Sequence, residues 1–155
     1  MQMMPVFMEH FDLDFFLVAM PYTLLDQSPL EEVFPACKKR EIGIIIGSPY
    51  ASGILATGSK YESTYGYASP DNEILKKVKS IESICKEYDV PLKAASLQFP
   101  LFHPLVASVI PGMLDKEEVL ENIQMIKHPI PAELWLDLKN SGILHPEAPV
   151  GLSAE

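Results

Sequence analysis

The sequence predicts an α/β fold with three parallel strands and flanking helices. Three short apolar runs have the length of strands, at residues 14–20, 43–47 and 106–110. Each run is followed by a segment whose apolar residues recur at helical spacing. Most of the 14 prolines stand at expected helix starts or directly after expected strands. Parallel strands that are joined by right-handed crossovers are the expected geometry of such units.

The first third of the chain is expected to form a helix end, a strand and a second helix. Residues 3–11 are apolar and are interpreted as the tail of a helix. The run 14–20 is continuously apolar, which predicts a parallel strand buried on both faces. The sequence SPLE at 28–31 predicts a helix N-terminus with Ser28 as its cap. Pro35 inside that helix is expected to kink or loosen it.

Residues 48–69 are rich in glycine, serine and tyrosine and predict a long irregular loop. Loops of this length are usually functional or disordered. Tyr61, Tyr65 and Tyr67 are compatible with a substrate lid, with a contact surface for another subunit or with a mobile loop. The last two interpretations are favoured together over the lid.

Four helices are expected in the second half of the chain, beginning near residues 70, 91, 116 and 131. In the third of these helices, the residues expected to face inward are Val119, Leu120, Ile123 and Ile126. In the last helix, Trp135 and Leu138 are expected to be buried, with Gly142 as its C-cap. Residues 143–155 are expected to form an irregular C-terminal extension.

The net charge of −9 argues against nucleic acid as a partner, because no basic stripe is available to neutralise phosphates. No apolar run approaches the roughly 20 residues of a membrane-spanning helix, so no membrane association is expected. The first residues lack the basic region and cleavage site of a secretory signal, which indicates a cytoplasmic protein. Cys37 and Cys85 fall on apolar helical faces, and buried reduced thiols are favoured over a disulfide.

Familiar catalytic patterns do not account for this sequence. Ser48 and Ser52 are not part of a G-x-S-x-G elbow. The four histidines are far apart in sequence and are interpreted as turn or packing residues, so no metal site is predicted: they are His10, His103, His128 and His145. No carboxylate pair stands out as an acid–base couple.

The segment 106–122, VASVIPGMLDKEEVLEN, combines a strand, a glycine turn and a helix start. Asp115 and Glu118 have the spacing of a capping box. Because backbone N–H groups at a helix start lack intrahelical partners, such an end can also bind an anion. Taken alone, this pattern is a weak indication of a phosphate site, and about half of such junctions serve only as connections.

Together with other segments, this stretch resembles the aldo-keto reductases. The resemblance rests on IPG at 110–112 with Glu121-Asn122, and on YTLLDQ at 22–27, SPYASGIL at 48–55, VPLKAASLQFPL at 90–101 and HPIPAELWLDLK at 128–139. These segments are similar to the branch that oxidises sugars and pyridoxal. The resemblance implies the C-terminal portion of a TIM (β/α)8 barrel, with residues 1–155 as one partial domain.

The resemblance also implies an NAD(P)-dependent oxidoreductase that transfers a hydride between a nicotinamide and a carbonyl or hemiacetal carbon. In the family, the catalytic aspartate, tyrosine, lysine and histidine all lie upstream of the matched segments. No catalytic residue is therefore assigned, and the chain alone is expected to be inactive.

Two loops match the family's dinucleotide site. Ser48, Tyr50, Ser52 and Gly53 match the loop that holds the pyrophosphate. The positions around the adenosine are Gly112, Leu114, Asp115, Glu118, Glu121 and Asn122, and the family's asparagine at the last of them typically reads the adenine edge.

Three departures from the family pattern favour NAD over NADP. Leu114 stands where arginine or lysine is usual, Asp115 replaces serine or threonine, and Glu118 replaces glutamine or arginine. A 2′-phosphate would therefore meet two carboxylates, with Lys116 as the only nearby cation, and like charges repel. Loss of cofactor binding altogether is also compatible with these departures.

A partial barrel would leave two strand edges and an inner sheet face uncovered. We therefore expect a homo-oligomer or pairing with a complementary N-terminal half. An aldose or aldehyde substrate is expected only in a complete barrel. Two alternatives are a non-enzymatic oligomeric remnant and one subunit of a split oxidoreductase.

Overall fold

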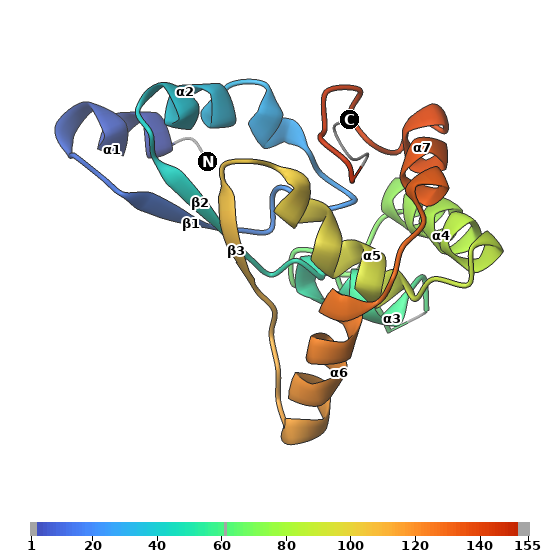
Figure 1. The fold of residues 1–155 in the computed structure, drawn as a ribbon. Coiled ribbons are helices and arrows are strands. Elements are labelled where there is room, and N and C mark those ends of the chain that lie inside the picture. Colours follow the sequence, from blue (N-terminus) through green and yellow to red (C-terminus); the bar gives the residue numbers. More distant parts are fainter. Residues whose placement is uncertain (1–2, 61, 152–155) are drawn as a thin grey trace.

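The computed structural model describes residues 3–60 and 62–151, and it confirms the predicted α/β architecture. Figure 1 shows three strands with helices around them. In chain order the elements are α1 (Met4–His10), β1 (Phe15–Ala19), η1 (Ser28–Leu30), α2 (Val33–Lys39), β2 (Gly43–Gly47), η2 (Ala51–Gly53), α3 (Ile54–Thr57), α4 (Asn72–Glu87), α5 (Leu92–Gln98), η3 (Phe99–Phe102), β3 (Val106–Ile110), α6 (Lys116–Lys127) and α7 (Ala132–Asn140).

The sheet has the order β1-β2-β3, and both strand pairs are parallel. The central strand β2 pairs along its whole length with β1, from Phe15 opposite Gly43 to Ala19 opposite Gly47. Its pairing with β3 shifts register between Ile44 and Ile45. The two edges of this sheet are β1 and β3.

One face of the sheet packs against helices, and the other face is open. Val18, Ile44 and Ile46 are buried on the helix side. On the opposite face Leu17 is 58% exposed and lies beside Ile45. The prediction that β1 is buried on both faces is therefore wrong. Its apolar run is typical of a doubly covered strand, but the described residues cover only one side.

The second helix begins later than the sequence pattern predicted. Ser28 lies in the short 3-10 helix η1 and makes no side-chain cap, and α2 begins at Val33. Because of this shift, Pro35 falls in the first turn of α2, where a backbone N–H has no intrahelical partner. Pro35 therefore removes no intrahelical hydrogen bond, and the kink that the sequence predicted is not expected at this position.

The segment 48–69 is more ordered than its composition predicted, because it contains η2 and α3. Ile54 and Leu55 are fully buried, and this burial holds the short helix against the core. Beyond α3 the chain is irregular, with one isolated bridge between Tyr65 and Ala68. Tyr67 is exposed, and Tyr61 lies outside the described residues.

The helix α6 departs most from its predicted packing. Val119, Leu120 and Ile123 are exposed, with Leu120 at 50%, and Ile126 is only partly buried. Within the described part of α6, Asn122 is the buried residue. Figure 1 shows α6 extending away from the sheet beside α5. The apolar stripe of α6 thus resembles a helix face that would be covered in a larger structure.

The C-terminal part follows the prediction closely. Trp135 and Leu138 are buried on α7. Gly142 has a φ of 72°, and the N–H of Ile143 donates to the Leu138 carbonyl at 3.2 Å, as expected for a glycine-terminated helix. The described tail to residue 151 contains no helix or strand, and residues 152–155 lie outside the described part.

The core contains both cysteines, and the partly buried His103 packs at its edge. Cys37 and Cys85 are buried free thiols, as predicted. His103 packs on Tyr22 and Phe34, which confirms it as a packing residue. Burial, with a smaller contribution from Lys38, lowers the pKa of His103 to about 4. None of the helices in the described ranges is long and apolar enough to cross a bilayer.

The asymmetry of the sheet predicts different costs for mutations on its two faces. Ile46→Ala should lower the free energy of unfolding by about 2–5 kcal/mol, because a fully buried side chain leaves a cavity. Leu17→Ala removes an exposed side chain and should change it by less than about 0.5 kcal/mol. Urea denaturation followed by circular dichroism measures both values. Equal costs would contradict an open sheet face.

Candidate functional site

The predicted site residues come together at one edge of the sheet. The loop after β2 carries Ser48 to Gly53, and the loop after β3 leads to Asp115 at the start of α6. Because parallel strands end at the same edge, both loops open on the same side, where ligands bind in many α/β folds. The N–H of Ser48 donates to the Ile110 carbonyl at 3.2 Å and joins the starts of the two loops.

The loop after β2 is tightly turned. Ser48, Ala51 and Ser52 have φ values of 55°, 48° and 60°, and Gly53 has a φ of 104°. Such backbone is strained for the three residues that carry a Cβ. The Ser52 hydroxyl donates to the sulfur of Met20 at 3.2 Å, and its carbonyl accepts from Thr64 Oγ1 at 2.7 Å. The loop shape is therefore fixed by contacts to neighbouring segments.

The helix start after β3 is capped as its sequence predicted, with one difference. Asp115 Oδ1 accepts from the N–H of Glu118 at 2.9 Å. The Glu118 carboxylate does not return to the N–H of Asp115, as a capping box requires, but accepts from the N–H of Leu114 at 2.7 Å. The Leu114 side chain is 94% exposed at this turn. A Cβ at Gly112 would meet no atom within 4 Å, so its position does not require glycine for space.

A buried hydrogen bond links the loop after β2 to α6. Tyr50 Oη donates to Asn122 Oδ1 at 2.6 Å, and each residue is only 8% exposed. Burial, with a smaller contribution from the charge of Glu121, raises the pKa of Tyr50 to about 12. The phenol is therefore protonated at neutral pH and acts as a donor. This bond holds α6 against the loop after β2.

A cation that the sequence interpretation did not include is paired with Glu121, which precedes Asn122 in the sequence. Lys93 on α5 forms an ion pair with Glu121 on α6, with 2.5 Å between Nζ and Oε2. The sequence interpretation counted Lys116 as the only nearby cation. Lys93 and Glu121 are 28 positions apart, and no local pattern in the sequence could reveal this pair. Because Lys93 is already paired with Glu121, its charge is largely compensated.

An apolar cavity of about 220 Å³ opens beside Asn122, between α5, β3 and α6. Asn122 is the one polar residue among those that line it. The others are Leu97, Val109, Pro111, Met113, Val119, Ile123 and Ile126. Apolar walls with a single convergent polar group are typical of small-molecule sites.

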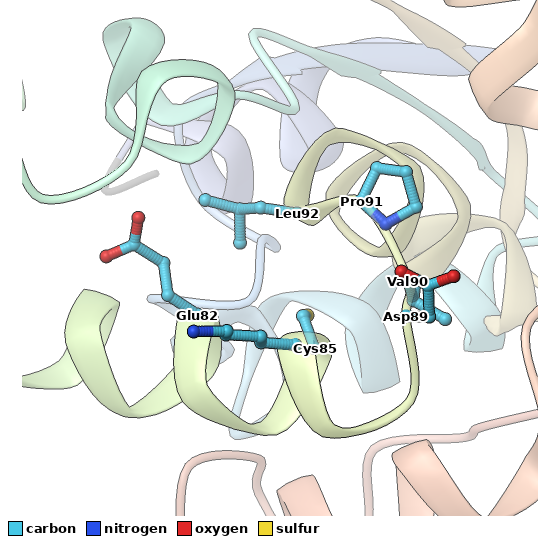
Figure 2. A pocket seen from close by; sticks show the side chains of 7 residues that line it. Glu82, Cys85, Asp89, Val90, Pro91 and Leu92 are labelled. Carbon is cyan, nitrogen blue, oxygen red and sulfur yellow. The ribbon is translucent and has the colours of Figure 1, made fainter.

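A second cavity, of about 430 Å³, lies between the end of α4 and the start of α5 (Figure 2). Ser59 Oγ donates to its Glu82 carboxylate at 2.7 Å. Burial, with a contribution from Glu82, raises the pKa of Cys85 to about 12, so this thiol is not a nucleophile at neutral pH. None of the predicted site residues lines this cavity. In the described ranges, no group of three or more potential ligands could hold a metal ion.

The model of the aldo/keto reductase family matches residues 1–141. The pyridoxal 4-dehydrogenase of Microbacterium luteolum is 37% identical over 137 residues, which are 88% of this chain and 40% of that protein. The D-threo-aldose 1-dehydrogenase of a Pseudomonas species is 38% identical over 134 residues, which are 86% of this chain and 41% of that protein.

A solved aldo-keto reductase has a similar fold. An aldo-keto reductase from Bacillus halodurans, in its apo form, superposes with a TM-score of 0.64 and 24% identity, and it covers 88% of this chain and 46% of that one. This coverage fits the predicted partial barrel. The chain spans about 40% of the length of the curated relatives it matches.

The buried phenol of Tyr50 predicts a measurable titration. Because its pKa is raised to about 12 from 10.0, the neutral phenol favours folding below pH 10, and this contribution is lost as the pH rises toward 12. The difference in tyrosinate absorbance between the wild type and Tyr50→Phe should have its midpoint near pH 12. A midpoint near 10 would contradict the buried hydrogen bond.

Proposed function

The chain belongs to the aldo/keto reductase family, and we propose that it supplies the dinucleotide-binding part of an oxidoreductase site. Members of this family use nicotinamide cofactors of the NAD(P) type. The main support for the proposal is the Tyr50–Asn122 hydrogen bond, which joins the loop after β2 to α6 and so fixes the two predicted binding segments relative to each other. The apolar cavity beside Asn122 adds a pocket of suitable chemistry for a base.

The residues of this site fit a nicotinamide dinucleotide. The turned loop from Ser48 to Gly53 would hold the pyrophosphate. Asn122 would contact the base. The bound nicotinamide would supply or accept the hydride, while this chain would bind and orient the other end of the cofactor.

NAD is the preferred cofactor in this proposal. The exposed Leu114 offers no charge to a 2′-phosphate, and the carboxylates of Asp115 and Glu118 lie at the same turn. Lys93, the additional cation, is paired with Glu121. A phosphate at this turn would therefore meet more negative than positive charge.

Fluorescence titration with NADH and NADPH tests the cofactor proposal. The purified chain should bind NADH about tenfold more tightly than NADPH, which corresponds to a difference of about 1.4 kcal/mol in binding free energy. Leu114→Arg should remove most of that difference by strengthening NADPH binding. Leu120→Arg, at another exposed leucine of the same region, is the matched control and should keep the difference. Equal affinity of the wild type for both cofactors would contradict the preference.

The reaction that we propose is oxidation of an aldose or a related aldehyde in a complete barrel. The names of the two relatives above, a pyridoxal dehydrogenase and an aldose dehydrogenase, support this substrate class. In this proposal the family's catalytic aspartate, tyrosine, lysine and histidine belong to the part of the barrel upstream of the matched segments, so the chain alone is expected to be inactive. Its partner would contribute those groups.

A complementary N-terminal half is the partner that the surface favours. Phe15 and Leu17 are exposed on the open sheet face, and Ile110 is exposed at the other edge. Both edge strands are parallel to β2, so closing a parallel barrel would need further parallel strands at each edge. A polypeptide with the remaining βα units of an eight-stranded barrel would meet this requirement.

Mixing experiments test the partner proposal. The N-terminal part of the Microbacterium luteolum relative, ending where the matched region begins, should form a 1:1 complex with this chain. Pyridoxal or aldose oxidation should appear only in the mixture, and ANS fluorescence of the chain should fall as the open face is covered. Light scattering and NADH formation are the measurements.

Two variants provide the controls for the mixture. Leu17→Lys places a charge on the open face and should prevent the complex, whereas Leu136→Lys, on α7, should not. Turnover by the lone chain would contradict the proposed division of the site. Self-association without NADH binding would instead support the non-enzymatic oligomeric protein.

A further inference from the structure

The hydrogen bond between Tyr50 and Asn122 holds the loop after β2 against α6, and it also fixes the orientation of the Asn122 amide. A side-chain amide has an acceptor end and a donor end of nearly the same shape, and a half-turn exchanges them. The Tyr50 phenol lies 2.6 Å from Oδ1 and remains protonated at neutral pH. In the structure the phenol donates to Oδ1, so the amide is held with its acceptor end toward Tyr50 and its donor end away from it.

This orientation leaves defined groups of Asn122 for a ligand. Within the described residues, Nδ2 makes no hydrogen bond, and Oδ1 accepts only from Tyr50. A carbonyl oxygen has two lone pairs, so Oδ1 can accept a second hydrogen bond. The amide can thus offer one donor and one acceptor side by side.

Adenine carries the complementary pair, an amino donor next to the acceptor nitrogen N7. Asparagine can bind this pair with two hydrogen bonds. Hypoxanthine has a carbonyl in place of the amino group and would set one acceptor against Oδ1. The apolar walls of the cavity could contact the faces of either base equally well.

We propose that Tyr50 is a positioning residue that orients the Asn122 amide and thereby makes the site select adenine over hypoxanthine. The inference rests on the dinucleotide-binding function proposed above. It assigns to Tyr50 a part in base selection through Asn122, without contact between Tyr50 and the reacting atoms.

Calorimetric titration with NAD and with nicotinamide hypoxanthine dinucleotide tests this role. The wild type should bind NAD about tenfold more tightly than the hypoxanthine analogue, which corresponds to one good hydrogen-bonding pair. Tyr50→Phe should reduce this ratio to about twofold or less, chiefly by weakening NAD binding. In the Asn122→Ala background, Tyr50→Phe should cause no further change.

Tyr88→Phe is the matched control, because it removes a phenol that donates to Asp137 Oδ2 at 2.5 Å, away from the site. It should keep the wild-type ratio. If Tyr50→Phe does not fold, Asn122→Asp keeps an acceptor for Tyr50 but lacks the donor, and it should also lose the ratio.

The outcomes separate this inference from the proposed function. Equal weakening of both dinucleotides by Tyr50→Phe, or no weakening of either, would overturn the positioning role. A wild type that binds both dinucleotides equally would overturn base selection and leave dinucleotide binding intact. A wild type that binds neither would overturn the proposed function and this inference together.

Discussion

The parallel pairing of β2 with a strand on each side is the constraint on which the rest of the structure depends. Ile44 and Ile46 of β2 are fully buried, so the strand cannot slip by one residue without exposing them. With this register fixed, the ends of β2 and β3 lie next to each other, at Gly47 and Ile110. The loops that follow then start at the same edge. The Tyr50–Asn122 hydrogen bond can therefore join the loop after β2 to α6. The candidate site is thus a consequence of strand order.

The two faces of the same sheet differ in how far they are covered. Helices cover the face that carries Val18 and Ile46, but Leu17 remains 58% exposed on the other face. The apolar stripe of α6 is exposed as well, at Val119, Leu120 and Ile123. Exposed apolar surface, where it is contiguous, commonly marks an interaction site. The chain spans about 40% of its relatives' length, which supports the proposal that further βα units cover the open sheet face.

Sequence reasoning succeeded where the signal is local and failed where it depends on distant residues. The β-branched runs were sufficient to predict β2 and β3, and Asp115 was predicted as a helix cap from residues within one turn. The apolar stripe of α6 was predicted to face inward, because periodicity identifies an apolar face but not what covers it. The Tyr50–Asn122 bond joins residues 72 positions apart, and the partner of Lys93 is 28 positions away. A single sequence does not show which distant positions lie close in space, so these contacts could be found only in the structure.

The charge of the chain raises the question of how it could select between two anionic cofactors. A net charge of −9 repels any dinucleotide, but ions screen charges over roughly 8 Å at physiological salt. Most of the 21 acidic residues are therefore too distant to distinguish NAD from NADP, and charges at the contact decide. At the turn before α6, two carboxylates are each fixed by a backbone N–H, at 2.7 and 2.9 Å, and cannot easily turn away from a phosphate. Because the same hydrogen bonds cap the helix, the proposed preference for NAD and the stability of α6 would depend on the same two side chains.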